Sequence, residues 1–209
     1  PEYKPLRSLY GMVNNFQRLS NSRDEARYEI TLQPRLALLA HGRQYRLYQQ
    51  QSVPEIVEHI LRSRHDFLGQ HFLFQLVREY PRREQVMQYG ESDLAFIERL
   101  LAEVGIWYRF SHDDRLQIDV VEFHDDQRHY QFGVKLPLRA PAGFASGEDG
   151  VWGLQTRHQV VEKSINFRAY HHRDARARLD GEVDQTRATT TTTYGEAYHY
   201  AEPYRVLGD

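Results

Sequence analysis

The sequence predicts an α+β protein that consists mainly of antiparallel strands and carries an inserted unit with helices. Three observations support this fold class. Before residue 50, apolar and polar residues alternate with a period of two, which is typical of strands that bury one face. Two apolar stripes with helical spacing follow between residues 52 and 105. Strand patterns return from residue 129 onward, so the helices interrupt a chain that is otherwise rich in strands.

The first strand region covers residues 26–50. Its alternation sets Tyr28, Ile30 and Leu32 against Arg27, Glu29 and Thr31. Residues 36–39 and 45–48 continue the strand pattern on the two sides of a turn at Gly42. We interpret these segments as strands of a barrel.

A first helix is predicted to begin after Ser52. The run Ser52-Val53-Pro54-Glu55 has the form of a capping box with proline in the first turn. An apolar stripe then consists of Val53, Ile56, Val57, Ile60 and Leu61. This pattern indicates a helix of about three turns.

A second helix and a hairpin follow two short strand-like segments, residues 72–78 and 84–89. Ser92 is placed to cap this helix, Asp93 adds negative charge at its positive end, and Gly105 favours the left-handed conformation that ends helices. Its apolar face consists of Leu94, Ile97, Leu100, Leu101 and Val104, with Glu98, Arg99 and Glu103 outward. Residues 106–110 and 116–120 are then expected to pair across a turn at 111–115. Residues 51–123 together predict one compact α+β unit.

The last third of the chain again has strand patterns. Tyr130, Phe132 and Val134 alternate, residues 137–150 form a loop rich in Pro, Ala and Gly, and a long strand is expected from Leu154 to about Tyr170. Hydrophobicity falls between residues 173 and 193, which include five consecutive threonines. Threonine favours extended backbone, so we predict an exposed edge strand or a mobile arm there.

Composition bounds the function. The chain has 209 residues, of which 40% are hydrophobic and 12% aromatic, which is enough for a sizeable core. Lys and Arg number 27 against 29 Asp and Glu, so a net charge of -2 gives no general reason to expect nucleic acid or an anionic membrane as a partner. The lack of cysteine excludes a disulfide framework and a thiolate site and agrees with folding in the cytoplasm. No apolar run approaches the roughly 20 residues that span a bilayer, so we expect no stable membrane insertion and no Sec-type export.

Some of the histidines have neighbours that could make them metal ligands. His124, Asp125, Asp126 and His129 are close in sequence, but adjacent ligands in a turn rarely converge on one ion, so a solvated turn is favoured. His171 and His172 point to opposite faces of a strand. Glu55 and His59 share a helix face, where a surface pair is the common outcome. The sequence therefore predicts no metal site.

Catalytic and cofactor motifs are also missing from the sequence. There is no nucleophile elbow, phosphate-binding glycine loop or dinucleotide fingerprint. Glu91, Asp93, Glu98 and Glu103 are explained by helix capping and a solvent face, and Arg78, Arg82 and Arg83 by a solvated loop. We predict no cofactor and no catalytic residue.

Aromatic residues give better evidence for contact surfaces. Core burial is the favoured explanation for Trp107, Tyr108 and Phe110. Four tyrosines near the C-terminal end of the sequence lie among polar residues, so burial in a core explains them less well. They are Tyr194, Tyr198, Tyr200 and Tyr204. These four tyrosines are the candidate interface residues.

Two strings carry a resemblance to a known family. They are Tyr45-Arg46-Leu47-Tyr48-Gln49-Gln50-Gln51-Ser52-Val53-Pro54-Glu55-Ile56-Val57 and the segment from Tyr89 to Phe110, which includes Glu91-Ser92-Asp93-Leu94-Ala95-Phe96-Ile97-Glu98-Arg99-Leu100-Leu101-Ala102-Glu103-Val104-Gly105-Ile106-Trp107. In these strings the chain closely resembles the VgrG spike proteins of type VI secretion, which are related to the baseplate hub of contractile-tailed phages. Because the chain starts at Pro1 and stops at Asp209, just after an aromatic segment, we expect it to be a fragment of such a hub.

The resemblance implies a fold and a role. Residues 1–50 would be strands of an incomplete first hub barrel, residues 51–123 the inserted α+β unit, and residues 124–209 part of a second hub barrel with a mobile segment at 173–193. The implied role is structural and not enzymatic, at the tip of the inner tube of a contractile machine. A trimer with two similar barrels per chain would offer a pseudo-sixfold ring to a hexameric, Hcp-like tube protein, and the spike would carry effector or adaptor proteins. The protein would be cytoplasmic during assembly and then secreted through the machine.

Three alternatives remain open at this point. The first is a phage or prophage tail hub, which shares the fold and the symmetry. The second is a cell-wall glycan hydrolase, which would need two carboxylates about 5–10 Å apart in a cleft. The third is a carbohydrate-binding β domain that uses the tyrosines. For this piece alone, we expect a monomer or weak association, because much of the surface that holds three copies together would be missing.

Overall fold

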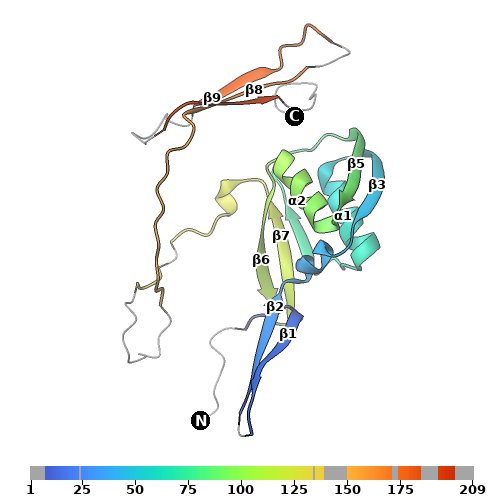
Figure 1. Cartoon of the computed structure of the whole chain (residues 1–209). Coiled ribbons are helices and arrows are strands. Elements are labelled where there is room, and N and C mark those ends of the chain that lie inside the picture. The colour runs from blue at the N-terminus through green and yellow to red at the C-terminus, as the bar shows by residue number, and fades with distance from the viewer. Residues whose placement is uncertain are drawn as a thin grey trace. The chain divides into compact units, whose positions relative to one another are not determined.

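The computed structural model describes residues 8–23, 25–133, 135–138, 150–170, 174–184 and 193–200. The chain divides into two compact units, Pro1–His129 and Tyr130–Asp209 (Figure 1). Strands dominate and two α-helices lie in the first unit, which confirms the predicted α+β class. The boundaries predicted for the barrels and the inserted unit remain predictions. Within the described ranges, no helix has the length and apolar character needed to cross a membrane.

The first unit begins with a two-stranded antiparallel ribbon of β1 (Met12–Asn21) and β2 (Ala26–Gln33). All ten residues of β1 and most of β2 are exposed. The rings of Phe16 and Tyr28 stack across the two strands with 5.4 Å between centroids. The ribbon therefore has large apolar side chains but no covered face.

Residues 36–39 are helical, so the prediction of strand there is wrong. They belong to the 3-10 helix η1 (Arg35–Ala40), whose Leu36 and Leu39 are buried. A spacing of three puts both leucines on one side of a 3-10 helix, whereas in a strand they would point to opposite faces. The backbone N–H of Arg35 donates to Asp119 at 2.8 Å and fixes the start of the helix.

The first helix, α1 (Val53–His65), has the predicted capping box. The Ser52 hydroxyl accepts the Glu55 N–H, and a Glu55 carboxylate oxygen accepts the Ser52 N–H at 2.8 Å. The predicted stripe Val53, Ile56, Val57, Ile60 and Leu61 is buried. The helix ends at Asp66, which has the left-handed conformation with φ of 54°.

Five strands and a second helix complete this unit. The strands are β3 (Gln44–Gln51), β4 (Phe72–Gln75), β5 (Arg83–Glu91), β6 (Trp107–Asp113) and β7 (Ile118–His124). β3 pairs with β5 antiparallel, while β7 lies between β4 and β6, parallel to the former and antiparallel to the latter. The β6–β7 hairpin was predicted, but β6 continues to Asp113, so the turn begins later than expected.

The second helix, α2 (Asp93–Glu103), is capped as predicted. The Ser92 hydroxyl accepts the Ala95 N–H at 3.2 Å, and Gly105 beyond the last turn has φ of 67°. Glu98, Arg99 and Glu103 are exposed as expected. Phe96, which the predicted stripe left out, is fully buried and stacks on Tyr48.

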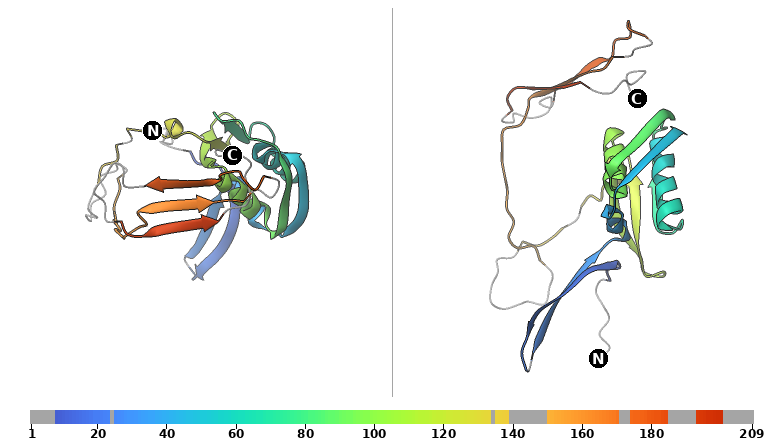
Figure 2. Two further views of the ribbon diagram at one scale, coloured as in Figure 1. Left: turned by 90° about the horizontal axis from the view of Figure 1, so that it is seen from above. Right: turned by 45° about the vertical axis from the view of Figure 1, so that its right-hand side comes forward.

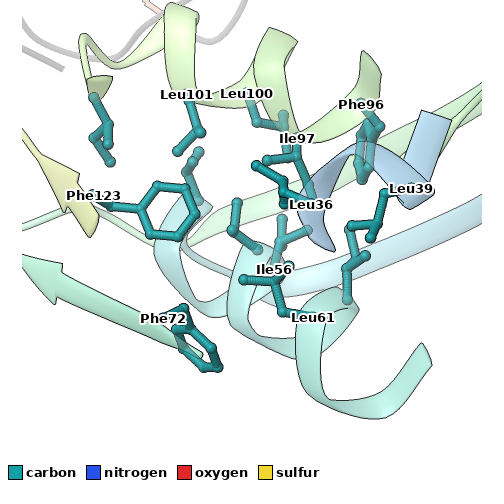
Figure 3. Close-up of a cluster of buried hydrophobic side chains, with 14 of the residues drawn as sticks. Leu36, Leu39, Ile56, Leu61, Phe72, Phe96, Ile97, Leu100, Leu101 and Phe123 are labelled. Carbon is teal, nitrogen blue, oxygen red and sulfur yellow. The ribbon is translucent and has the colours of Figure 1, made fainter. Parts of the chain in front are cut away.

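One hydrophobic core lies where the two helices, η1 and the sheets meet (Figure 3). Figure 3 shows Ile97, Leu100 and Leu101 of α2 facing Ile56 and Leu61 of α1. Leucines of η1 and the rings of Phe72 and Phe123 close the cluster from other sides. The elements from η1 to β7 thus share one apolar interior, which holds them together as one body, whereas the β1–β2 ribbon contributes no residue to this cluster.

After the 3-10 turn η2 (Gln127–His129), the second unit has a three-stranded sheet with order β10-β8-β9 (Figure 2). Its strands are β8 (Ser164–Arg168), β9 (Asp180–Asp184) and β10 (Glu196–Tyr200). Tyr130 and Phe132 are not in a strand, and Val134 lies outside the described residues. The expected long strand from 154 is also wrong, because only 164–168 has strand partners on both sides.

The polar stretch 173–193 contains an edge strand. β9 pairs antiparallel with β8, and Leu179 just before it is buried. Thr193 makes an isolated bridge with Val161, whereas 185–192, which hold most of the threonine run, lie outside the described residues. The edge-strand alternative is therefore supported at 180–184.

Candidate assembly surfaces

The predicted tyrosine set lies partly on the second sheet. Tyr198 and Tyr200 belong to β10 and are 60% and 67% exposed, and Tyr194 is 84% exposed. Tyr204 lies outside the described residues. Tyr200 is paired in register with Arg168 of β8, and Tyr198 and Tyr200 line a shallow groove of about 530 Å³. Tyr194, Tyr198 and Tyr200 are available for contacts, and the role of the four tyrosines as interface residues remains a prediction.

A second candidate surface is the β1–β2 ribbon. Its exposed large apolar side chains are Met12, Val13, Phe16, Leu19, Tyr28, Ile30 and Leu32. An isolated two-stranded hairpin is marginally stable in water, and contiguous exposed apolar surface marks a site that another element or chain covers. The alternation in residues 26–50 predicts β2 but not β1, and it marks no interface residue on the ribbon.

The third candidate is the outer β3–β5 face, which consists of Tyr45, Leu47, Met87 and Tyr89. These side chains are between 50% and 74% exposed. Tyr45 lies opposite Tyr89 and Leu47 opposite Met87, and the two tyrosine rings meet edge to face at 5.0 Å. The opposite face of the same strands buries Tyr48 and Val86 in the core. Sequence alternation distinguishes a buried apolar face from an exposed polar one. It does not identify this exposed face, because both sides of these strands are apolar.

The region around His124 is not a solvated turn, so that prediction is wrong. His124 is fully buried at the end of β7, with its ring stacked on Trp107 and 4.7 Å from the ring of His129. Burial lowers the pKa of His124. The hydrogen bond with Glu122 raises this pKa, whereas the positive charge of the neighbouring Arg109 lowers it further. The Glu122 carboxylate in turn binds Arg109 at 2.8 Å. The neutral imidazole is therefore the form that fits this site.

Asp125, the next residue, organises the segment after β4. Its carboxylate accepts the backbone N–H groups of Val77 and Arg78 and the hydroxyl of Tyr80, all at 2.9–3.1 Å. Burial alone would raise the pKa of Asp125, but these hydrogen bonds outweigh burial and lower it. Burial and the bond to Asp125 raise the pKa of Tyr80 to about 12. These hydrogen bonds make Asp125 a structural anchor for the segment that follows β4.

Asp93 lies in the first turn of α2, as predicted, and its side chain is buried there. Its carboxylate lies 3.1 Å from Arg64, 2.7 Å from His65 and 2.8 Å from the Gln88 amide. The first two belong to the last turn of α1 and the third to β5. One residue at the start of α2 thus joins three elements.

The remaining charged candidates are engaged in ion pairs. Arg82 binds Glu55, Arg83 binds Glu103, and Arg78 lies 3.6 Å from Asp125. Glu55 is therefore committed to the helix cap and to Arg82, away from His59. His171 and His172 lie outside the described residues. Over the part of the chain that the structure describes, no group of three or more acidic or histidine side chains could hold a metal ion.

Comparison with known proteins identifies a family and individual relatives. A model of the phage tail baseplate hub (GPD) family matches residues 4–209. Among solved structures, the chain is similar to the E. coli c3393 protein, described as a component of the type VI secretion system with structural similarity to the T4 bacteriophage tail proteins gp27 and gp5. The identity is 60%, the TM-score is 0.61, and the match covers 64% of this chain and 37% of that one.

Two curated relatives are similar in sequence. The type VI secretion system spike protein VgrG4b of Pseudomonas aeruginosa is 40% identical over 119 residues, 57% of this chain and 14% of the relative. The actin cross-linking toxin VgrG1 of Vibrio cholerae is 34% identical over 166 residues, 79% of this chain and 15% of the relative. The chain thus spans about one seventh of the length of these two proteins.

Proposed function

Since the chain belongs to the phage tail baseplate hub family, we propose that it forms part of the hub of a type VI secretion spike. Its role is structural: it helps to cap the inner tube of the contractile machine and to deliver effectors. The observation that carries this proposal is the 60% identity and shared fold with a type VI secretion component. The spike name of the P. aeruginosa relative supports the same role.

The exposed apolar strands suit a part that works inside an assembly. Both faces of the β1–β2 ribbon are exposed. We therefore propose that residues 1–50 contribute to a first hub barrel which further strands complete. In the same scheme residues 51–123 are the inserted unit and residues 124–209 belong to a second barrel. The tyrosines Tyr194, Tyr198, Tyr200 and Tyr204 would then contact neighbouring strands or subunits.

The proposed partners follow from symmetry. Three copies of a hub with two similar barrels present six similar surfaces, which match a hexameric, Hcp-like tube ring. Effector or adaptor proteins would bind the complete spike, and no nucleic acid partner is proposed. The protein would assemble in the cytoplasm and leave the cell through the machine. The toxin name of the V. cholerae relative belongs to a protein of which this chain matches 15%, and we propose no enzymatic activity for this part.

A secretion experiment tests the proposal. The complete gene product that contains this chain is tagged and followed in culture supernatants of the wild-type strain and of a strain without the contractile sheath. We expect the tagged protein and the tube protein in the supernatant only when the sheath is present. Equal release from both strains would contradict the role in type VI secretion.

A phage or prophage tail hub is the second candidate, because the family model is that of a phage baseplate hub. The two candidates share the fold but differ in the particle that contains them. If the tagged protein copurifies with virions after prophage induction, and its release does not require the type VI sheath, the phage assignment holds instead.

A further inference from the structure

The two edges of the β3–β5 sheet differ in how they are protected. Among the strands that the structure describes, β3 and β5 pair only with each other, so each has one edge that no other described strand covers. On β5, the guanidinium of Arg99 donates to the Met87 carbonyl at 3.0 Å and that of Arg43 to the Gly90 carbonyl at 3.4 Å. Among the described residues, no hydrogen bond from outside the sheet reaches the backbone of Gln44–Gln51 in β3. An unprotected edge of this kind is a template for strand pairing.

A groove runs along this strand and against α1. Its volume is about 300 Å³ and its lining consists of Arg46, Leu47, Tyr48, Gln49, Gln51 and His59. His59 comes from α1, and its ring meets the ring of Tyr48 edge to face at 6.1 Å. Figure 1 shows α1 and β3 in the same part of the first unit. A strand edge beside a helix provides backbone groups on one side and side-chain pockets on the other, which is the arrangement that binds extended peptides.

The charge balance at the groove favours an acidic ligand. Arg46 is exposed and makes no ion pair with any residue that the structure describes, whereas Glu55 and Glu58 on the adjacent helix are bound by Arg82 and Arg62. The groove therefore has an excess of positive charge, which a carboxylate of a bound segment would neutralise.

We propose that an extended segment of a partner protein adds to β3 as a third strand. The segment is short, because β3 has eight residues and the groove beside it has a volume of about 300 Å³. Apolar side chains alternate along the segment, because one side of the added strand would extend the face on which Tyr45 and Leu47 are exposed. A carboxylate of the segment pairs with Arg46. The groove is lined by six residues, whereas a stable interface with a globular partner takes about 20–30 residues a side, which favours a peptide over a second folded domain.

The test uses a fluorescein-labelled peptide of about nine residues, matched to the length of β3, in which valine alternates with threonine and one threonine is replaced by glutamate. Binding is measured by fluorescence anisotropy with the complete chain, and hydrogen exchange follows the amides of β3. We expect saturable binding and slower exchange at Gln44–Gln51. A peptide with alternate backbone nitrogens methylated should bind at least about tenfold more weakly, because it cannot donate to the strand edge.

Charge reversal gives the specific control. Arg46→Glu should weaken binding of the glutamate peptide by about tenfold, and a peptide with lysine in place of glutamate should recover most of this loss. Arg115→Glu, an exposed arginine in the β6–β7 turn, should change neither. Circular dichroism verifies that each variant is folded.

Three results would overturn the inference. The methylated peptide could bind as well as the parent, which would mean that the strand edge is not used. Single-stranded DNA of similar length could compete equally, which would indicate general attraction to positive charge. Finally, the chain could dimerise in the absence of peptide with β3 protected from exchange, in which case a second copy occupies the edge.

Discussion

At the scale of single residues, Asp93 shows how one carboxylate joins separate elements. Its side chain is 4% exposed and contacts Arg64 and His65 of α1 and Gln88 of β5. Breaking a buried ion pair leaves an uncompensated charge, so Asp93→Asn should lower the free energy of unfolding by about 3 kcal/mol. Urea denaturation measures this loss. Asp114→Asn in the exposed β6–β7 turn is the control and should leave stability unchanged; equal effects of the two substitutions would refute the proposed role.

His124 provides a pH prediction at the same scale. Burial lowers its folded pKa below the ordinary value of about 6.5, so the unfolded chain binds the proton more tightly than the folded one. The folded state is therefore favoured above pH 6.5 and loses stability as the pH falls below that value, until the folded imidazole also becomes protonated. Burial also lowers the pKa of His71, which adds to the dependence of stability on pH.

Urea denaturation at a series of pH values tests this prediction. Between pH 7 and pH 5, His124→Phe should lose less stability than the wild type, whereas His41→Gln, at an exposed site, should follow the wild type. The lowered pKa of Asp125 acts only below its ordinary value of 3.8, outside this window. An unchanged slope in His124→Phe would mean that the buried imidazole does not set the pH dependence.

At the scale of elements, the cap of α1 makes a local contribution that can be measured. Ser52→Ala removes the hydroxyl that accepts the Glu55 N–H and should cost about 1 kcal/mol. Ser63→Ala makes the same chemical change at an exposed position within α1 and should be neutral or slightly stabilising, because alanine favours helix. Thermal denaturation compares the two variants. A loss at Ser63 as large as that at Ser52 would contradict the capping assignment.

The elements also show what the sequence can predict. Both helices and their caps are correct, because the signals lie within a few residues of each other, as in Ser52-Val53-Pro54-Glu55. The 3-10 helix at 35–40 was not predicted, since its leucines are explained only by a core that distant residues build. The parallel pairing of β4 with β7 joins residues far apart in sequence, and no local pattern encodes it.

The candidate site was harder to predict than the fold. The tyrosines at 194, 198 and 200 are exposed, as their polar neighbours suggested, but the unprotected edge of β3 depends on which strand pairs with which. The anchors at His124 and Asp125 were missed for a similar reason. Their burial arises from Trp107, Val77 and Arg78, which the sequence places elsewhere.

At the scale of the whole molecule, the β1–β2 ribbon should respond to assembly. In the chain alone its amides should exchange within seconds to minutes, because a two-stranded ribbon with both faces exposed opens easily. In the assembled hub the same amides should be strongly protected. Hydrogen exchange with mass spectrometry measures both states, with α1 and α2 as protected references. A ribbon equally protected in the two states would contradict the incomplete-barrel proposal.

The central claim is that this chain is part of a trimeric hub, and molar mass tests it most directly. Light scattering after size exclusion, on the complete gene product that contains the chain, should give three times the protomer mass. The chain alone should be monomeric or weakly associated. A strictly monomeric complete protein would contradict the hub assignment.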